Sequence, residues 1–293
     1  MKIAIYGKPF ENALNKEVPQ LMKTLADHGI EIAIYERYAQ FLRDNGLLTL
    51  PCATYTREEV EIASFTFLLS VGGDGTLLDT VTIVGNSGIP VIGLNAGRLG
   101  FISSIAITEF EAILKSIMDN TYHSDLRSLL QVHTSSGLFG AFNYALNEVT
   151  IHKKDTASMI QIETYLDDEF MNTYWADGLI VATPTGSTAY SLSCGGPIIV
   201  PGSQNLVITP IAPHNLNVRP VVVSNASKIS LRIRGRSDNF LIALDSRSES
   251  ITPEEEIVIT KAGFTYNLLQ APGQTFLNNM RNKLGWGLDK RNK

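Results

Sequence analysis

The sequence predicts a chain of two parts, with an α/β first half built on a parallel sheet and a second half made mostly of β-strands. Three observations lead to this fold class. The length of 293 residues exceeds the usual size of one domain. Up to about residue 125, short apolar runs alternate with stretches of helical period, which is typical of parallel sheets. Beyond it, closely spaced strand-like runs alternate with turn signals. We therefore expect domains at 1–125 and 126–272.

The first half begins as a β-α-β unit. Strand-like runs at 2–6 and 30–35 flank a helical stretch that ends near Gly29 and whose apolar residues recur at helical spacing: Leu14, Val18, Leu21, Met22 and Leu25. A strand at 65–71 then leads into a glycine-rich segment, followed by a helix from Leu77 and a strand at 90–94. Ligands of such sheets bind at the carboxyl ends of the strands.

The second half contains many short strands and ends in a helix. Turns are expected at 135–137 and 167–168. Phe276, Met280 and Leu284 form one apolar stripe, so we expect a helix over 273–293 to dock, with the first domain as the candidate surface. The alternative is a solvated terminus that frays beyond residue 285. The strand-like runs are 130–134, 141–152, 158–166, 169–175, 179–182, 228–234, 240–244, 256–260 and 264–269.

Composition excludes several classes of protein. The net charge of −5 argues against nucleic-acid binding, which depends on neutralising phosphates. No apolar run is long enough to span a membrane, and the N-terminus lacks the pattern of a signal peptide, so we expect a cytoplasmic protein with no membrane partner. Cys52 and Cys194 lack the spacing of a zinc site or redox pair.

The most informative segment delivers three glycines and one carboxylate to the start of a helix: Gly72, Gly73, Asp74, Gly75 and Thr76. Glycines let backbone N–H groups approach phosphate closely, and a helix N-terminus adds positive potential. A carboxylate beside phosphates repels them unless it binds a metal ion or accepts a proton from an attacking hydroxyl. Phosphoryl transfer requires both a bound metal ion and a proton acceptor. The alternative is a tight turn in which Asp74 merely caps the helix.

Two weaker signals follow. The segment 95–101 supplies further glycines and the guanidinium of Arg98, which can pair with a phosphate, although an ordinary loop explains it equally well. Asn147 and Glu148 interrupt an apolar strand-like run, so one of them should point inward and require a hydrogen-bond partner such as a ligand. Alternatively, the pair marks a strand end or a bulge.

Residues 177–197 form the longest segment whose residue types indicate a ligand-binding function. A strand ends at Thr183, and a turn shaped by Pro184 and Gly186 then opens a short helix rich in small hydroxyl residues. Hydroxyls, amides and the flat ring of Tyr190 suit a ribose and an adenine, and Asp177 can accept a hydrogen bond from a ribose or amide group. A surface turn rich in Ser and Thr, with a capped helix, is the alternative.

In this order and at these separations, the segments resemble the NAD kinases over roughly residues 1–285. The glycine segment alone is shared with diacylglycerol and sphingosine-type lipid kinases and with phosphofructokinases, whereas its combination with Asn147, Glu148 and the 177–197 segment is similar to NAD kinases in particular. The resemblance implies an N-terminal α/β domain and a C-terminal domain of layered β-sheets, with the active site between them and the last helix returning to the first domain.

The resemblance also implies a reaction and its residues. A phosphoryl group from ATP or another donor would pass to the 2′-hydroxyl of the adenosine ribose of NAD, giving NADP and ADP. Asp74 would be the catalytic carboxylate, and Gly72, Gly73, Gly75 and Thr76 would cradle phosphates with Arg98. The NAD-binding residues would be Asp74, Gly75, Asn147, Glu148, Asp177, Thr185, Thr188, Ala189, Tyr190, Ser191, Leu192, Ser193 and Ala212. A divalent ion such as Mg²⁺ would accompany the donor without direct protein ligands, and the chain would form a dimer or tetramer.

Two rival functions stay open at this point. A lipid kinase of the diacylglycerol-kinase type would share the glycine segment but would need an apolar groove for acyl chains. A nucleotide-sensing module without catalysis would gain nothing from Asp74 next to phosphate. The chain has neither a Walker A motif nor G-x-G-x-x-G, so a P-loop kinase and a Rossmann dehydrogenase are not indicated.

Overall fold

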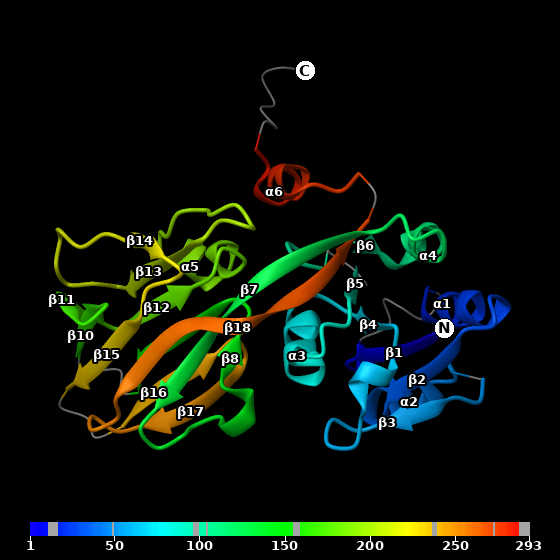
Figure 1. Ribbon diagram of the computed structural model, residues 1–293, viewed down its shortest axis with the longest axis horizontal. Helices are drawn as coiled ribbons and strands as arrows, with labels where there is room; N and C mark the ends of the chain where they lie inside the picture. Colours follow the sequence, from blue (N-terminus) through cyan, green and yellow to red (C-terminus); the bar gives the residue numbers. More distant parts are fainter. Residues whose placement is uncertain are drawn as a thin grey trace. The chain divides into compact units, whose positions relative to one another are not determined.

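The chain divides by its backbone contacts into two compact units (Figure 1). A computed structural model describes residues 1–10, 17–48, 50–95, 100–103, 105–154, 159–235, 239–271 and 273–286. Unit 1 comprises Met1–Leu126 and Tyr266–Lys293, and unit 2 comprises Arg127–Thr265. Among the described residues, no helix is long and apolar enough to cross a membrane.

Unit 1 is built on a parallel sheet. Its strand order is β3-β2-β1-β4-β5, with β6 and the end of β18 also paired with β5. Its elements are β1 (Lys2–Gly7), α1 (Glu17–Asp27), β2 (Glu31–Tyr35), α2 (Glu36–Asp44), β3 (Ala53–Tyr55), η1 (Ile62–Ser64), β4 (Phe67–Val71), α3 (Asp74–Val84), β5 (Val91–Asn95), β6 (Ile105–Ala106), η2 (Ile107–Glu109), α4 (Phe110–Met118) and α6 (Phe276–Leu284).

The strand order places a topological switch point between β1 and β4. The chain runs outward from β1 to β2 and β3, and then returns to the other side of β1 for β4 and β5. Gly7, the last residue of β1, pairs with Val71, the last residue of β4. Open α/β sheets bind ligands outside the carboxyl ends of the strands at such a point. The glycine segment that follows β4 therefore lies where the fold itself predicts a ligand.

Helices pack on both faces of this sheet. The apolar stripes of α1, α2 and α4 join alternate residues of the central strands in one core, in which Ile5, Leu69 and Ile92 are fully buried. Gly93 follows Ile92 and faces the opposite side, where a side chain would lie 2.5 Å from Leu77 of α3. The missing side chain of Gly93 thus lets α3 pack closely against the sheet.

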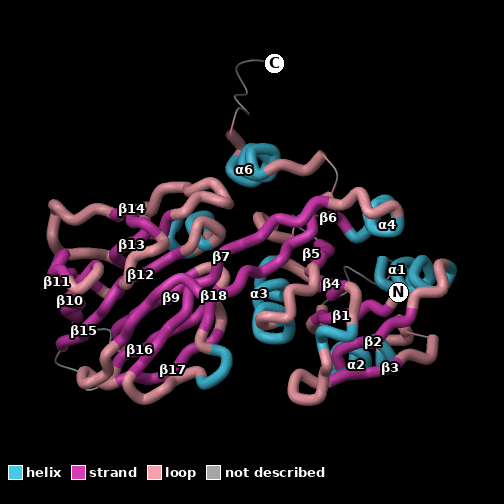
Figure 2. The backbone as a smooth tube through the Cα atoms, in the orientation of Figure 1, coloured by secondary structure: helices cyan, strands magenta, loops and turns pink. Residues whose placement is uncertain are grey.

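The regular secondary structure of unit 2 is mostly β-strand, with long loops between some of the strands (Figure 2). One sheet has the order β14-β13-β12-β9-β16-β17, and a second joins β11, β10, β15, β18, β7 and β8. Residues of both sheets form one apolar core, among them Ile151, Leu179, Leu231 and Phe240. The elements are β7 (His123–Thr134), η3 (Gly140–Phe142), β8 (Tyr144–Ala145), β9 (Glu148–Lys153), β10 (Ile160–Leu166), β11 (Glu169–Ala176), β12 (Gly178–Ala182), η4 (Gly186–Thr188), α5 (Tyr190–Ser193), β13 (Asn205–Ile211), β14 (Val221–Ser224), β15 (Ile229–Arg234), β16 (Phe240–Leu244), β17 (Arg247–Ile251) and β18 (Ile257–Gln270).

Three sequence predictions of elements were wrong in detail. The two runs 256–260 and 264–269 form one strand, β18, because pairing with β15 at its start and with β5 at its end keeps the backbone extended through Gly263. The single run 141–152 is instead divided into η3, β8 and β9, with a break at Leu146 and Asn147. Helix α3 begins at Asp74, three residues earlier than predicted.

The expected turn at 167–168 is confirmed, since both residues have positive φ between β10 and β11. Helix α6 begins after Thr275, whose side-chain oxygen accepts a hydrogen bond from the Asn278 N–H, and none of its residues is buried. Its docking on the first domain stays a prediction.

Candidate active site

The glycine turn between β4 and α3 has two residues, Gly72 and Gly73. Gly72 has φ +154°, and a Cβ there would lie 2.4 Å from the Thr76 Oγ1, so both its backbone and its surroundings require glycine. Gly73 and Gly75 are exposed, with open space where a Cβ would stand. Thr76 and Leu77 make the first backbone bonds of the turn, both to the Gly73 carbonyl. The earlier amides therefore lie at an accessible helix start that suits an anion.

Asp74 does not cap α3. The N-cap position is Gly73, and no side chain caps the helix there. The Asp74 carboxylate instead accepts three backbone N–H bonds from one loop: Phe101 at 2.8 Å, Ile102 at 3.2 Å and Ser103 at 2.8 Å. The alternative in which Asp74 is merely a cap is thus wrong. The side chain is held in a fixed orientation at the switch point of the sheet.

The loop that holds Asp74 is itself tied to the glycine turn. The Ser103 hydroxyl donates to the Gly72 carbonyl at 3.1 Å, and the Asn95 side-chain amide donates to the Ser103 carbonyl at 3.0 Å. A Cβ on Gly100 would lie 1.8 Å from the Asp74 Oδ1, so the loop approaches the carboxylate as closely as a backbone can. Arg98, predicted to bind phosphate, lies outside the described residues.

In unit 2, strand pairing brings Asn147 and Glu148 beside the 183–188 loop. Strands β9 and β12 are antiparallel, with Glu148 opposite Ala182, so β9 begins where β12 ends. The Thr183 N–H donates to the Asn147 carbonyl at 2.9 Å, and its hydroxyl donates to the Leu146 carbonyl at 2.6 Å. A Cβ on Gly186 would lie 2.1 Å from the Asn147 carbonyl oxygen. The two sequence signals thus lie side by side in unit 2.

Asn147 and Glu148 each present a buried acceptor without a partner. The Asn147 Oδ1 and the Glu148 Oε2 are shielded from solvent and have no hydrogen-bond partner among the described residues. Burial raises the pKa of Glu148 to about 8, and the neighbouring charge of Asp245 adds to this effect. The pair does lie at a strand start, as the alternative interpretation expected. An unpaired buried acceptor is nevertheless costly, and donors from a ligand would remove that cost.

Thr185 lies at the same end of the strand pair. It is buried, and its hydroxyl oxygen accepts a hydrogen bond from the Arg127 guanidinium at 3.2 Å. Arg127 is itself buried, which is rare for an arginine that lacks a functional or structural partner. A positive charge therefore stands behind the loop predicted to bind NAD.

The other predicted NAD residues gather at the opposite end of the strand pair. Asp177 precedes β12 and forms an ion pair of 2.6 Å with Lys153 at the end of β9. Tyr190 stacks on His152 with ring centroids 6.4 Å apart and an interplanar angle of 5°. Ala212 has φ +45° and directly follows Ile211, whose carbonyl accepts the Asp177 N–H. Strand rise separates this end from Asn147 by about 17 Å, so the site suits an elongated ligand.

The remaining predicted residues differ in accessibility. Ser191 is buried and bonds to the Thr209 hydroxyl at 2.8 Å, so in this arrangement its role is to fasten α5 to β13. The Thr188 hydroxyl donates to the Thr185 carbonyl at 3.2 Å. Ala189 and Leu192 are half-buried, and Ser193 is exposed.

Several residues of the site were missed by sequence reasoning. Arg127, Lys153 and Asp245 are single charged residues in strands or turns, and nothing in their local sequence distinguishes them from solvated charges. Gly100 belonged to a recognised segment, but its contact with Asp74 depends on the tertiary fold.

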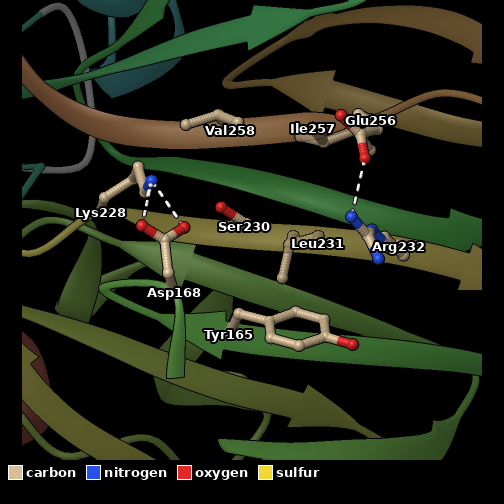
Figure 3. Close-up of a pocket in the computed structure, with 9 residues that line it drawn as sticks. All are labelled: Tyr165, Asp168, Lys228, Ser230, Leu231, Arg232, Glu256, Ile257 and Val258. Carbon is tan, nitrogen blue, oxygen red and sulfur yellow. Dashed lines mark hydrogen bonds and ion pairs between the residues drawn. The ribbon is translucent and has the colours of Figure 1, made fainter. Parts of the chain in front are cut away.

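Figure 3 shows a separate cavity of about 300 Å³ in unit 2. It lies over β10, β15 and β18, where Ser230 and Arg232 face away from the core that their neighbour Leu231 joins. Its charges are already paired, Lys228 with Asp168 at 2.7 Å and Arg232 with Glu256 at 2.9 Å. None of the predicted site residues lines this cavity.

Comparison with known families matches both units. Residues 3–122 match the ATP-NAD kinase N-terminal domain, and residues 146–271 match the ATP-NAD kinase C-terminal domain. Curated relatives cover the whole chain. A protein of Flavobacterium psychrophilum named NAD kinase is 45% identical over 294 residues and covers 100% of both chains, and one of Bacteroides fragilis with the same name is 40% identical over 291 residues, covering 99% of this chain and 100% of its own.

Solved structures share the fold. A yeast NADH kinase complexed with NADH has a TM-score of 0.89 at 22% identity, covering 100% of this chain and 89% of that one. An NAD kinase from Archaeoglobus fulgidus in complex with ATP has a TM-score of 0.74 at 26% identity, covering 97% and 98%. The predicted combination of an N-terminal parallel-sheet domain and a C-terminal β-sheet domain is thereby confirmed.

Proposed function

We propose, from the premise that this chain belongs to the ATP-NAD kinase family, that it transfers a phosphoryl group to the 2′-hydroxyl of the adenosine ribose of NAD, forming NADP. The observation that carries this proposal is the carboxylate of Asp74, which stands at the switch point beside accessible backbone amides but does not serve the helix. The switch point of the sheet and the accessible backbone amides both favour a phosphorylated ligand, and the carboxylate supplies a proton acceptor.

The proposed role of Asp74 is to accept the proton of the attacking hydroxyl. Three hydrogen bonds from backbone amides fix the orientation of the Asp74 carboxylate, so the side chain does not have to be ordered during the reaction. The backbone of Gly73 and Gly75 would hold phosphate oxygens, with Gly72, Thr76 and Arg98 as further predicted contacts. The proton passes from the ribose oxygen to Asp74 as that oxygen bonds to the γ-phosphorus of the donor, and the bond between this phosphorus and the bridging oxygen breaks so that ADP leaves.

Unit 2 would hold the dinucleotide. The unpaired acceptors of Asn147 and Glu148 suit the hydroxyl and amino donors of the adenosine part. Asp177 and Tyr190, at the other end of the β9–β12 pair, would contact the remainder of NAD together with Ala212. That both units act on one molecule of NAD stays a prediction.

ATP is the proposed donor, since a relative with this fold is described in complex with ATP. A divalent ion such as Mg²⁺ would be held mainly by the donor phosphates. In proteins, Mg²⁺ commonly relies on substrate phosphates and water rather than on a full set of protein ligands. When bound, the ion neutralises charge on the transferred group.

The deciding experiment is an assay for NADP with ATP and Mg²⁺, comparing wild type with Asp74→Asn. A positioned general base contributes about 10² to 10⁴ in rate, so turnover should fall by that factor while NAD still binds. Asp79→Asn is a matched control. It removes a carboxylate from the same helix, but this carboxylate forms an ion pair with Lys8. Wild-type turnover in Asp74→Asn would refute the assigned role.

The same assay separates the alternatives. Phosphorylation of diacylglycerol but not NAD would indicate a lipid kinase, for which the relatives give no support. Tight NAD binding without any NADP would indicate a sensor. Replacing ATP with other triphosphates or polyphosphate identifies the donor, and sedimentation of the purified chain tests the proposed dimer or tetramer.

A further inference from the structure

The turn between β16 and β17 is bonded to the segment that carries Asn147 and Glu148. The Asp245 carboxylate accepts three consecutive backbone N–H bonds, from Leu146 at 2.8 Å, Asn147 at 2.8 Å and Glu148 at 3.2 Å. The Asp245 N–H in turn donates to the Glu148 carbonyl at 3.1 Å. Asp245 has φ +52°, a left-handed conformation that glycine, asparagine and aspartate adopt more readily than other residues in turns.

Arg247, two residues further on, holds the preceding part of the same segment. Its guanidinium donates through Nη1 to the Phe142 carbonyl and through Nη2 to the Tyr144 carbonyl. The planar fork of arginine can serve two carbonyls at once, which a lysine cannot do with the same geometry. One turn thus supplies an acceptor for three amides and a donor for two carbonyls of residues 142–148.

These bonds explain why the strand is broken at Leu146 and Asn147. The amides of residues 146–148 point to Asp245, and the Leu146 carbonyl accepts the Thr183 hydroxyl. Backbone groups that are satisfied in this way cannot form a regular ladder at this point. The break fixes the backbone from which Asn147 and Glu148 present their unpaired acceptors.

We propose that Asp245 and Arg247 are positioning residues for NAD binding, which act by holding the 142–148 backbone so that the side chains of Asn147 and Glu148 meet the dinucleotide. This proposal rests on the proposed function. Neither residue needs to touch the ligand. Their contribution is that the two acceptors are already oriented before NAD arrives, which lowers the entropic cost of binding.

The test compares Asp245→Gly, Asp245→Asn and Arg247→Lys. Glycine accepts the positive φ but provides no acceptor, whereas asparagine retains one acceptor oxygen. We expect the NAD KM to rise about tenfold or more in Asp245→Gly and Arg247→Lys and by less in Asp245→Asn, with the ATP KM unchanged. Asp245→Asn and Arg247→Lys carry the test if the glycine variant does not fold.

Asp167→Asn is the matched control. Asp167 also has φ +52° in a turn between two strands, and its Oδ1 accepts the Lys228 N–H at 2.8 Å, but this turn lies beside the cavity of Figure 3. Thermal unfolding of all variants reports the structural cost. If the control loses similar stability and keeps the wild-type NAD KM, the effect of Asp245 is specific to the site.

A double-mutant cycle separates positioning from general destabilisation. When Asn147→Ala and Glu148→Ala are already present, Asp245→Asn should change NAD affinity little further, because the groups that it orients are gone. Equal effects of Asp245→Asn in both backgrounds, or an unchanged NAD KM in all three variants, would overturn the proposal. Absence of NAD binding to the wild-type chain in calorimetry would instead reject the proposed function.

Discussion

The pKa of Glu148 makes a quantitative prediction about stability. Burial is the main reason that the pKa of Glu148 is raised from the ordinary glutamate value of 4.5 to about 8. Between these pH values the folded chain keeps a proton that the unfolded chain releases. Folding stability therefore falls as pH rises from about 4.5 to about 8. At about 1.4 kcal/mol for each tenfold change in proton affinity, the loss through this group is at most about 5 kcal/mol.

Glu148→Gln removes the titrating group and keeps the shape of the side chain. Near pH 5 the wild-type carboxyl is protonated and resembles the amide, so the two proteins should have similar free energies of unfolding. Near pH 8.5 the variant should be more stable than wild type by about 3 to 5 kcal/mol. Urea unfolding followed by circular dichroism at several pH values measures the difference, with the NAD-free protein in every case.

Glu169→Gln, a change of an exposed glutamate at the start of β11, is the matched control. The reasoning requires the stability difference between Glu148→Gln and wild type to grow with pH. A difference that stays constant from pH 5 to pH 9, or wild type being the more stable protein at pH 8.5, would refute it.

Three further variants test single contacts. Gly100→Ala should cut turnover by tenfold or more, because its Cβ would overlap the Asp74 carboxylate, and normal kinetics would contradict the close approach. Gly186→Ala should raise the NAD KM, since its Cβ would meet the Asn147 carbonyl oxygen; an unchanged KM in a folded variant argues against it. Tyr266→Phe removes a buried 2.7 Å bond to a threonine hydroxyl and should lower the unfolding free energy by about 1 kcal/mol with unchanged kinetics.

The sequence allowed prediction of features that depend on neighbours along the chain. The β-α-β beginning, the turn after β10 and the short helix α5 all follow from local periodicity and turn residues. The glycine segment was predictable for the same reason, because the backbone freedom of Gly72 is a property of the residue itself. The segment from Asp177 to Pro197 was recognised by its composition.

Features that depend on distant residues could not be predicted. The break before β9 is caused by a carboxylate 97 residues away, at Asp245, and an apolar run with two polar residues does not reveal it. The continuity of β18 through Gly263 depends on pairing partners in both units. Helices α2 and α4 and strands β3, β13, β14 and β17 were not predicted. For α4 and β13 the local signal was present, since the buried residues Phe110, Ile113, Leu114 and Ile117 of α4 recur at helical spacing and β13 is an almost continuous apolar run.

The acidic residues of the proposed site are compatible with anionic substrates because the negative charge of each carboxyl group is offset by hydrogen bonds, by an ion pair or by a bound proton. Asp74 and Asp245 each accept three backbone amides, and Asp177 is paired with Lys153. Glu148 has no such donor on its buried oxygen among the described residues, and it responds by holding a proton up to about pH 8. Under the proposed function, a chain with a net charge of −5 would therefore need no basic surface to bind a dinucleotide and a triphosphate, because each of these carboxyl groups is either hydrogen-bonded, ion-paired or protonated. Removal of Lys153 would leave the negative charge of Asp177 without its ion-pair partner. NAD binding should then weaken more at low ionic strength than at high ionic strength, because salt screens the repulsion. A loss of packing alone would weaken binding equally at both salt concentrations.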